Sequence, residues 1–166
     1  MRENRDDAHH DQAEEDADRD RLAERGGDLV KLHTVATVEV QNVQLPVYAL
    51  VMGSHNPDAP AIGLFGGIHG VERIGTEVVL AYLQSLIEVL LWSPALRDQI
   101  SQMHIVIMPI VNPGSMVNNH RSNPNGVDLM RNAPLDASER VPYLIGGQRI
   151  SARLPWYRGS LGAPME

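Results

Sequence analysis

Residues 61–72 read AIGLFGGIHGVE, a short apolar run that ends in a glycine-rich turn. The continuous apolar character of residues 61–65, bounded by glycines, predicts a central strand covered on both faces. Residues 74–92 are rich in Leu, Val, Ala and Glu and contain no proline, which predicts a helix buried on most sides. The turn at residues 66–72 is therefore expected to join the carboxyl end of a strand to the start of a helix.

The sequence on either side of this unit completes a sheet. Residues 34–40 and 43–53 alternate between apolar and polar side chains around a polar turn, which predicts two antiparallel strands. Residues 103–111 form another apolar run and predict a second buried strand, after a short helix at residues 95–101. A strand, a crossover helix and a strand in this order imply a parallel pair. We therefore predict an α/β fold with a mixed, partly parallel sheet flanked by helices.

The charge of the chain is concentrated at its N-terminus. The 166 residues carry a formal net charge of -7, and residues 1–28 account for -6 of it. This segment is rich in Asp, Glu, Arg and Ala and poor in side chains that can be buried, so we expect a disordered or frayed helical tail. We place one partial α/β domain over residues 29–166.

Composition argues against several classes of function. The chain has no cysteine, so a metal ion would have to be held by His, Asp or Glu. Residues 29–166 are nearly neutral and contain no basic stripe, which argues against a nucleic-acid partner. The N-terminus lacks the apolar core of a signal peptide, and no apolar run reaches the roughly 20 residues that span a bilayer. We therefore expect a soluble, cytoplasmic protein without a membrane partner.

His69 and Glu72 set an imidazole and a carboxylate three residues apart where the apolar strand stops. A turn here can aim a ring nitrogen and a carboxylate oxygen at one point, each about 2.0–2.2 Å from a zinc ion. The carboxyl end of a strand in an open α/β sheet is also where ligands bind. Two alternatives stay open: the spacing arises by chance, or Glu72 is an acidic residue that stabilises the start of the helix.

A second polar cluster lies at residues 121–132 and contains Arg121, Asp128 and Arg131. One arginine could stabilise the negative charge that develops on a carbonyl oxygen when water attacks it. The other could hold a substrate carboxylate through two parallel hydrogen bonds. Asp128 could orient one guanidinium or the loop itself. The alternative is that both arginines only solvate a polar loop.

Several pieces of sequence stand in an order typical of one enzyme family: GGIHGVE at residues 66–72, VNPG at residues 111–114, Arg121, and NGVDLMRN at residues 125–132. From about residue 60 to residue 132 the chain resembles the zinc carboxypeptidases, the metallocarboxypeptidases similar to carboxypeptidase A. The resemblance implies the N-terminal half of an α/β/α fold and a zinc cofactor. It also implies specific roles: His69 and Glu72 as zinc ligands, Arg121 polarising the scissile carbonyl, and Arg131 and Asn132 binding the substrate.

The chain departs from the family pattern in two respects. Met130 stands where the family usually has an asparagine, and a thioether cannot donate a hydrogen bond. The family takes a third zinc ligand, a histidine, and a glutamate general base from sequence beyond this loop, and only His104 and His120 follow His69 here. We expect His104 to be structural because it lies in a predicted core strand. His120 adjoins Arg121 but does not match the position of the third ligand.

Three functions compete. The leading hypothesis is a carboxypeptidase-like enzyme that hydrolyses a peptide bond with a zinc-activated water. A deacylase of the aspartoacylase and succinylglutamate desuccinylase branch, which would take an N-acyl amino acid, shares the His-x-x-Glu start. The third is a catalytically inactive remnant that acts as a structural or binding module. We expect these residues to form the N-terminal half of a larger hydrolase domain, with an exposed edge at residues 103–111 that self-association or a partner chain covers.

Overall fold

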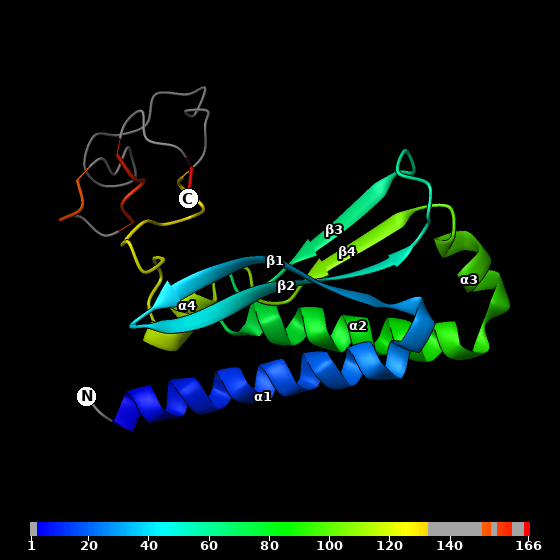
Figure 1. The fold of residues 1–166 in the computed structure, drawn as a ribbon, viewed down its shortest axis with the longest axis horizontal. Coiled ribbons are helices and arrows are strands. Elements are labelled where there is room, and N and C mark those ends of the chain that lie inside the picture. The colour runs from blue at the N-terminus through cyan, green and yellow to red at the C-terminus, as the bar shows by residue number, and fades with distance from the viewer. Residues whose placement is uncertain (1–2, 133–150, 154–155, 161–164) are drawn as a thin grey trace.

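The computed structural model describes residues 3–132, 151–153, 156–160 and 165–166, with side chains from residue 13 onward. The elements in chain order are α1 (Glu3–Gly26), the 3-10 helix η1 (Gly27–Leu29), β1 (Lys31–Val40), β2 (Val43–Gly53), β3 (Ala61–Phe65), α2 (Ile74–Trp92), α3 (Pro94–Ile100), β4 (His104–Met108) and α4 (Pro113–Asn118). In Figure 1, α1 and α2 run side by side beneath a twisted sheet. The predicted mixed α/β fold is confirmed.

The strands of the described residues form one sheet in the order β1-β2-β4-β3. β1 and β2 are antiparallel and meet at a two-residue turn, Gln41 and Asn42, whose φ angles of 51° and 66° suit the twist of a tight hairpin. β2 is antiparallel to β4, and β4 is parallel to β3 across the crossover helix α2. The predicted hairpin and the predicted parallel pair are both confirmed.

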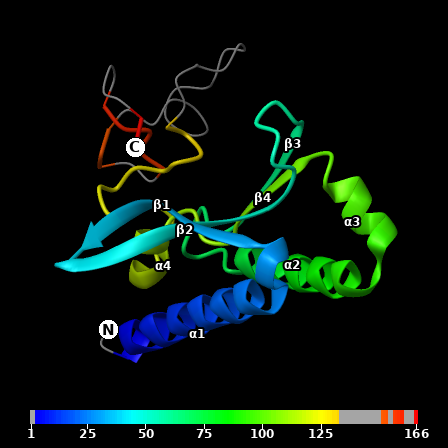
Figure 2. The ribbon, with the colours of Figure 1, turned by 45° about the vertical axis from the view of Figure 1, so that its right-hand side comes forward.

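The hydrophobic core lies between α2 and one face of the sheet. Leu83 and Ile87 of α2 are fully buried in one cluster with Leu50 of β2 and Ile107 of β4. Leu50 and Ile107 are direct partners in the strand register, so both side chains point to the same face. Figure 2, turned by 45° from Figure 1, again places α1 and α2 together on one side of the sheet. α1 and α2 therefore form a helical layer on that side of the sheet, and α3 lies at its end.

By length and composition alone, α2 is long and apolar enough to cross a membrane. The core helix of a soluble protein passes the same test, so one such helix is weak evidence for a membrane span. The prediction that this helix is buried on most sides is wrong. Leu80, Leu83, Ile87 and Leu90 form one buried stripe in the core cluster, whereas Ile74, Val78, Tyr82 and Trp92 are exposed, because only one side of α2 faces the sheet.

Two sequence predictions about the sheet are wrong. β3, predicted to be central and covered on both faces, lies at an edge of the described sheet, where Ile62 and Phe65 are 50% and 55% exposed. The run at residues 103–111, predicted to be an exposed edge, supplies β4, which lies between β2 and β3. The physical reason is that the β1-β2 hairpin adds to β4 rather than to β3. A continuous apolar run cannot report on which side of it the next strand pairs.

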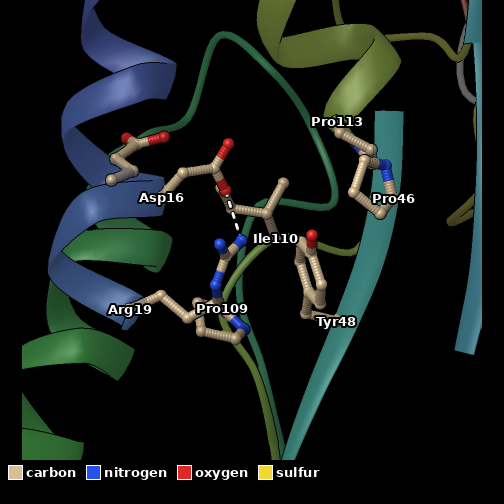
Figure 3. Close-up of a pocket in the computed structure, with 8 residues that line it drawn as sticks. Asp16, Arg19, Pro46, Tyr48, Pro109, Ile110 and Pro113 are labelled. Atoms are coloured by element: carbon tan, nitrogen blue, oxygen red, sulfur yellow. Dashed lines mark hydrogen bonds and ion pairs between the residues drawn. The ribbon is translucent and has the colours of Figure 1, made fainter. Parts of the chain in front are cut away.

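The structure also differs from the predicted disordered tail. Residues 3–26 form α1, which packs on α2 and α4, and Arg19 and Leu22 are buried. Figure 3 shows the Arg19 guanidinium over the Tyr48 ring, 3.8 Å from its centroid, with an ion pair to Asp16. The cavity that these residues share is only about 10 Å³, no more than one water. The sequence prediction failed because it counted arginine as a side chain that cannot be buried. An arginine can bury its aliphatic stem while an acidic neighbour pairs with its charge.

Candidate active site

The loop that carries His69 and Glu72 is fastened to the chain that leaves β4. Gly66 N donates to Met108 O at 2.9 Å, and Val111 N donates back to Gly66 O at 3.0 Å. These bonds continue the parallel pairing of β3 and β4 beyond the ends of both strands. The loop therefore begins at a fixed position at the carboxyl end of the sheet.

Two glycines allow this loop to approach its neighbours closely. Gly67 adopts a φ of +57°, a conformation that side chains with a Cβ rarely adopt. At Gly70, an added Cβ would lie 1.9 Å from the backbone oxygen of Ser115 in α4. The glycine-rich character of the turn is thus a steric requirement for packing the loop against α4.

Asn112 connects the loop to the start of α4. Its Oδ1 accepts a hydrogen bond from Ser115 N at 3.1 Å and so caps the helix. Its Nδ2 donates to Ile68 O at 3.2 Å, one residue before His69. One buried amide therefore fixes both the helix end and the backbone that presents the imidazole.

The His69 ring is buried, with 6% of the residue exposed, and each ring nitrogen faces a carboxylate. Nε2 lies 3.1 Å from Asp128 Oδ1, and Nδ1 lies 3.2 Å from Glu72 Oε2. A histidine that binds metal through one nitrogen commonly gives the other N–H to a carboxylate. Asp128 is placed to accept that N–H, which leaves Nδ1 as the nitrogen that can bind a metal beside Glu72.

Asp128 is fully buried and joins the two parts of the site that are distant in sequence. Its Oδ2 accepts hydrogen bonds from Arg121 Nε at 2.9 Å and from Arg131 Nη1 at 3.1 Å. Burial acts to raise the pKa of this carboxyl, but the hydrogen bonds from Arg121 and His69 outweigh it and hold the pKa below its ordinary value. Asp128 is therefore a charged acceptor for three basic side chains.

Glu72 is more exposed than Asp128, and its carboxylate contacts both His69 and Arg121. A hydrogen bond from a protonated His69 Nδ1 is the main cause that lowers the pKa of Glu72, and Arg121 lowers it further. A metal ion at Nδ1 would take the place of that proton. Arg121 Nη1 donates to Glu72 Oε1 at 2.8 Å, while Oε2 faces His69. Each oxygen of Glu72 thus has one neighbour, and Arg121 bridges Glu72 to Asp128.

The geometry of His69 and Glu72 fits two ligands of one zinc ion. Two ligands about 2.1 Å from a tetrahedral zinc lie about 3.4 Å apart, close to the 3.2 Å that separates Nδ1 from Oε2. Among the residues that the structure describes, no group of three or more His, Cys, Asp or Glu side chains is suited to hold a metal ion. This part of the chain therefore offers two ligands and not a full set.

The predicted substrate residues lie beside this centre but face different ways. Arg131, bonded to Asp128, lies under Trp156, with 5.6 Å between the guanidinium carbon and the ring centroid. Asn132 instead holds the C-terminal segment: its Nδ2 donates to Arg158 O at 2.9 Å and its Oδ1 accepts from Glu166 N at 2.8 Å. Asn132 thus bonds the C-terminal segment, whereas Arg131 bonds Asp128 of the candidate site.

A cavity of about 260 Å³ opens beside the two candidate ligands. Its walls include Phe65, His69, Glu72 and Met130, and Met130 is 59% exposed. This is the space in which a substrate could reach His69 and Glu72. The apolar Met130 thus presents a thioether where the family usually presents an amide.

His104 and His120 do not join the site as metal ligands. His104 Nε2 is 2.7 Å from Asn56 O at the opposite end of β4, which agrees with the structural role expected for it. His120 contributes its backbone: its carbonyl accepts from Gly70 N at 2.9 Å and so helps to hold the loop. The sequence did not indicate that Asp128 bonds His69, because the two residues are 59 positions apart and only the fold brings them together.

A mixed α/β sheet whose strand-end loop aims an imidazole and a carboxylate at one point is the architecture of a class of metal-dependent hydrolases. The chain belongs to the zinc carboxypeptidase family, whose model matches residues 17–144. The match begins inside α1, which agrees with the packing of that helix on the domain. Membership of this family implies zinc as the cofactor.

Known relatives are consistent with this assignment. The chain is 27% identical over 140 residues to carboxypeptidase E of Caenorhabditis elegans, covering 76% of this chain and 30% of the relative. It is 32% identical over 75 residues to carboxypeptidase SOL1 of Arabidopsis thaliana, covering 45% and 15%. The chain thus spans less than a third of these relatives.

Solved structures show the same fold. The crystal structure of thrombin activatable fibrinolysis inhibitor aligns with a TM-score of 0.65 at 22% identity, covering 84% of this chain and 37% of that one. A metallo-carboxypeptidase from Burkholderia cenocepacia aligns with a TM-score of 0.56 at 20% identity, covering 75% and 33%. The part of the fold that aligns therefore corresponds to about a third of each of these two chains.

Proposed function

We propose that His69 and Glu72 supply two ligands of a catalytic zinc ion in a hydrolase that cleaves a peptide bond. The observation that carries this proposal is the orientation of His69: Asp128 occupies Nε2, and Nδ1 is left 3.2 Å from Glu72 Oε2. A bound zinc ion would lower the pKa of its water and polarise the substrate carbonyl. A catalytic zinc needs three protein ligands, so these two form an incomplete set.

Arg121 fits the role of stabilising negative charge on the substrate. It already lies against Glu72 through Oε1, the oxygen that does not face His69, so it can remain in place when Oε2 binds metal. Its Nε is held by the buried carboxylate of Asp128. A guanidinium fixed in this way needs no reorganisation when charge develops on a carbonyl oxygen.

Arg131 fits the role of holding a substrate carboxylate. One of its N–H groups bonds Asp128, and the side chain is 38% exposed, so donors of the guanidinium fork remain accessible. Asn132 is less suited to this role in the present arrangement, because its amide already bonds Arg158 and Glu166. We therefore assign carboxylate recognition to Arg131.

The test is zinc binding by the metal-free chain, followed by competition with a chromogenic chelator. We expect one zinc per chain, with affinity reduced at least about tenfold in His69→Ala and in Asp128→Asn, whose carboxylate orients the ring. His55→Ala, at the other end of the sheet, is the matched control and should bind as the wild type does. Equal zinc binding by wild type and His69→Ala would refute the site.

Substrate class needs a separate assay on zinc-loaded protein. A short peptide with a free carboxyl terminus and an N-acyl amino acid are offered in parallel, with Arg131→Met as the variant. Cleavage of the peptide alone, lost in Arg131→Met, supports the carboxypeptidase assignment. Cleavage of the N-acyl amino acid alone indicates the deacylase, and zinc binding without either cleavage indicates a binding module.

A further inference from the structure

A second cavity, of about 550 Å³, lies at the end of the sheet opposite His69. His104 and Gly53, which pair at the first position of β4 and the last of β2, belong to its lining. The His69 loop instead leaves the sheet next to Met108, the last residue of β4. The two sites are therefore separated by the length of β4, five residues or about 15 Å of extended chain.

The inner wall of this cavity is apolar and belongs to the core. Met52, Leu90 and Ile100 line it, and each is less than 9% exposed. A volume of this size, with an apolar wall and a few polar groups around it, is typical of sites that bind small molecules. The cavity can thus receive an apolar group of a ligand.

The outer wall carries charges of both signs on two separate elements. Asp28 belongs to η1 and Lys31, the single lysine of the chain, begins β1, whereas Arg97 and Asp98 belong to α3. None of these four side chains forms an ion pair within the described part of the chain, in contrast to Arg19, which pairs with two aspartates. Both signs of charge are therefore open to a ligand.

We propose that this cavity binds a small zwitterion with an apolar side chain, either a free amino acid or a dipeptide. Its carboxylate would be held by Lys31 or Arg97, its ammonium by Asp28 or Asp98, and its side chain by the apolar wall. The η1–β1 segment and α3 each contribute one cation and one carboxylate to the lining, so a ligand with both charges can bridge the two segments. His33 and His55 on the rim add N–H donors for the ligand carboxylate. The assignment is independent of the proposed zinc site.

The single lysine allows a direct test. Reductive methylation with ¹³C-formaldehyde keeps the charge of Lys31 and gives one lysine methyl signal, beside that of the N-terminal amine as an internal control. Leucine and Leu-Leu are titrated separately and distinguish an amino-acid site from a dipeptide site. We expect a saturable shift of the Lys31 signal with one of them and none of the N-terminal signal.

Analogues and variants determine whether both charges matter. N-acetylleucine lacks the ammonium group and leucinamide lacks the carboxylate, and each should bind about tenfold more weakly, as expected for loss of one charged hydrogen bond. A bridging ligand uses either Lys31 with Asp98 or Arg97 with Asp28, so one of the two variants Arg97→Met and Asp98→Asn should weaken binding similarly and the other should not. Arg153→Met, outside the cavity, should bind as the wild type does, and unchanged binding in both α3 variants also overturns the proposal. Binding of N-acetylleucine as tight as that of leucine, or no saturable shift up to about 10 mM ligand, overturns the proposal.

Discussion

The charged side chains at the two ends of the sheet differ in whether they form ion pairs. At the carboxyl end of β3, Glu72 and Asp128 are bonded to His69, Arg121 and Arg131, so every charge has a partner. At the other end, Lys31 and Arg97 line a cavity without forming an ion pair in the described residues. The first arrangement fixes side chains before any ligand arrives, whereas the second leaves the charged groups available to bind one.

The difference also has a consequence for stability. At the end that carries His69, which we call the paired end, the charged side chains form ion pairs with one another. Asp128, which is fully buried, also accepts a hydrogen bond from the backbone N–H of Met130. We call the end that holds the second cavity the open end. At the open end, Asp28, Lys31, Arg97 and Asp98 are exposed and form no ion pair within the described residues. Substitutions at the two ends should therefore have very different effects on folding, and three experiments can break or sharpen this contrast.

The largest effect is expected from Asp128→Asn. The substitution keeps the shape of the side chain but removes its charge and leaves one acceptor oxygen where His69, Arg121 and Arg131 now share two. Breaking a buried ion pair costs about 3–5 kcal/mol, and we expect about 2–4 kcal/mol here because both arginines are partly exposed and can be hydrated. The free energy of unfolding is measured by urea denaturation followed by circular dichroism.

The matched control is Asp98→Asn at the open end, which should change the free energy of unfolding by less than about 0.5 kcal/mol. If Asp98→Asn costs as much as Asp128→Asn, the contrast between the two ends is wrong. A similar small loss in both variants would show that the paired network contributes nothing to folding.

The candidate site illustrates what sequence alone can and cannot reveal. His69 and Glu72 are three residues apart in a glycine turn, so their convergence is a local property that the pattern predicts. The bond from Asp128 to His69 joins residues 59 positions apart and depends on how residues 112–128 return to the loop. The second cavity draws its lining from β1, β2, α2, α3 and β4, and no sequence motif marks it.

A smaller effect is expected from Gly70→Ala, which tests the steric fit of the loop. The new methyl group would lie 1.9 Å from Ser115 O, so the loop or α4 must move, and overpacking of this kind costs about 1–3 kcal/mol. Gly75→Ala is the control, because its Cβ would have no neighbour closer than 3.8 Å and alanine favours a helix. Thermal unfolding should show a lower midpoint for Gly70→Ala and an unchanged or higher one for Gly75→Ala.

The fold was predictable to the extent that its signals are local. The β1-β2 hairpin and α2 follow from alternation and from a proline-free apolar run, and both agree with the structure. The order of the strands could not be predicted from these signals. The apolar side chains of β4 show that its faces are buried, but they do not show which strand pairs with each of its edges. The packing of α1 was missed for a related reason: the burial of Arg19 depends on Tyr48, a residue of another element.

The smallest effect should appear in the pH dependence of the Asp128 network. The pKa of Asp128 lies below its ordinary value, so the stabilisation is complete above the pKa of the unfolded carboxyl, about 3.9, and is lost as the pH falls through the lower, folded value. The difference in unfolding free energy between wild type and Asp128→Asn should therefore be constant above about pH 5 and shrink below about pH 4. The pH-dependent part of this free-energy difference is smaller than the full cost of the substitution, because it is set only by the gap between the unfolded and folded pKa values of Asp128. Urea denaturation of both proteins between pH 7 and pH 3 measures it, and a difference that stays constant in acid would mean that Asp128 acts through its shape and not through its charge.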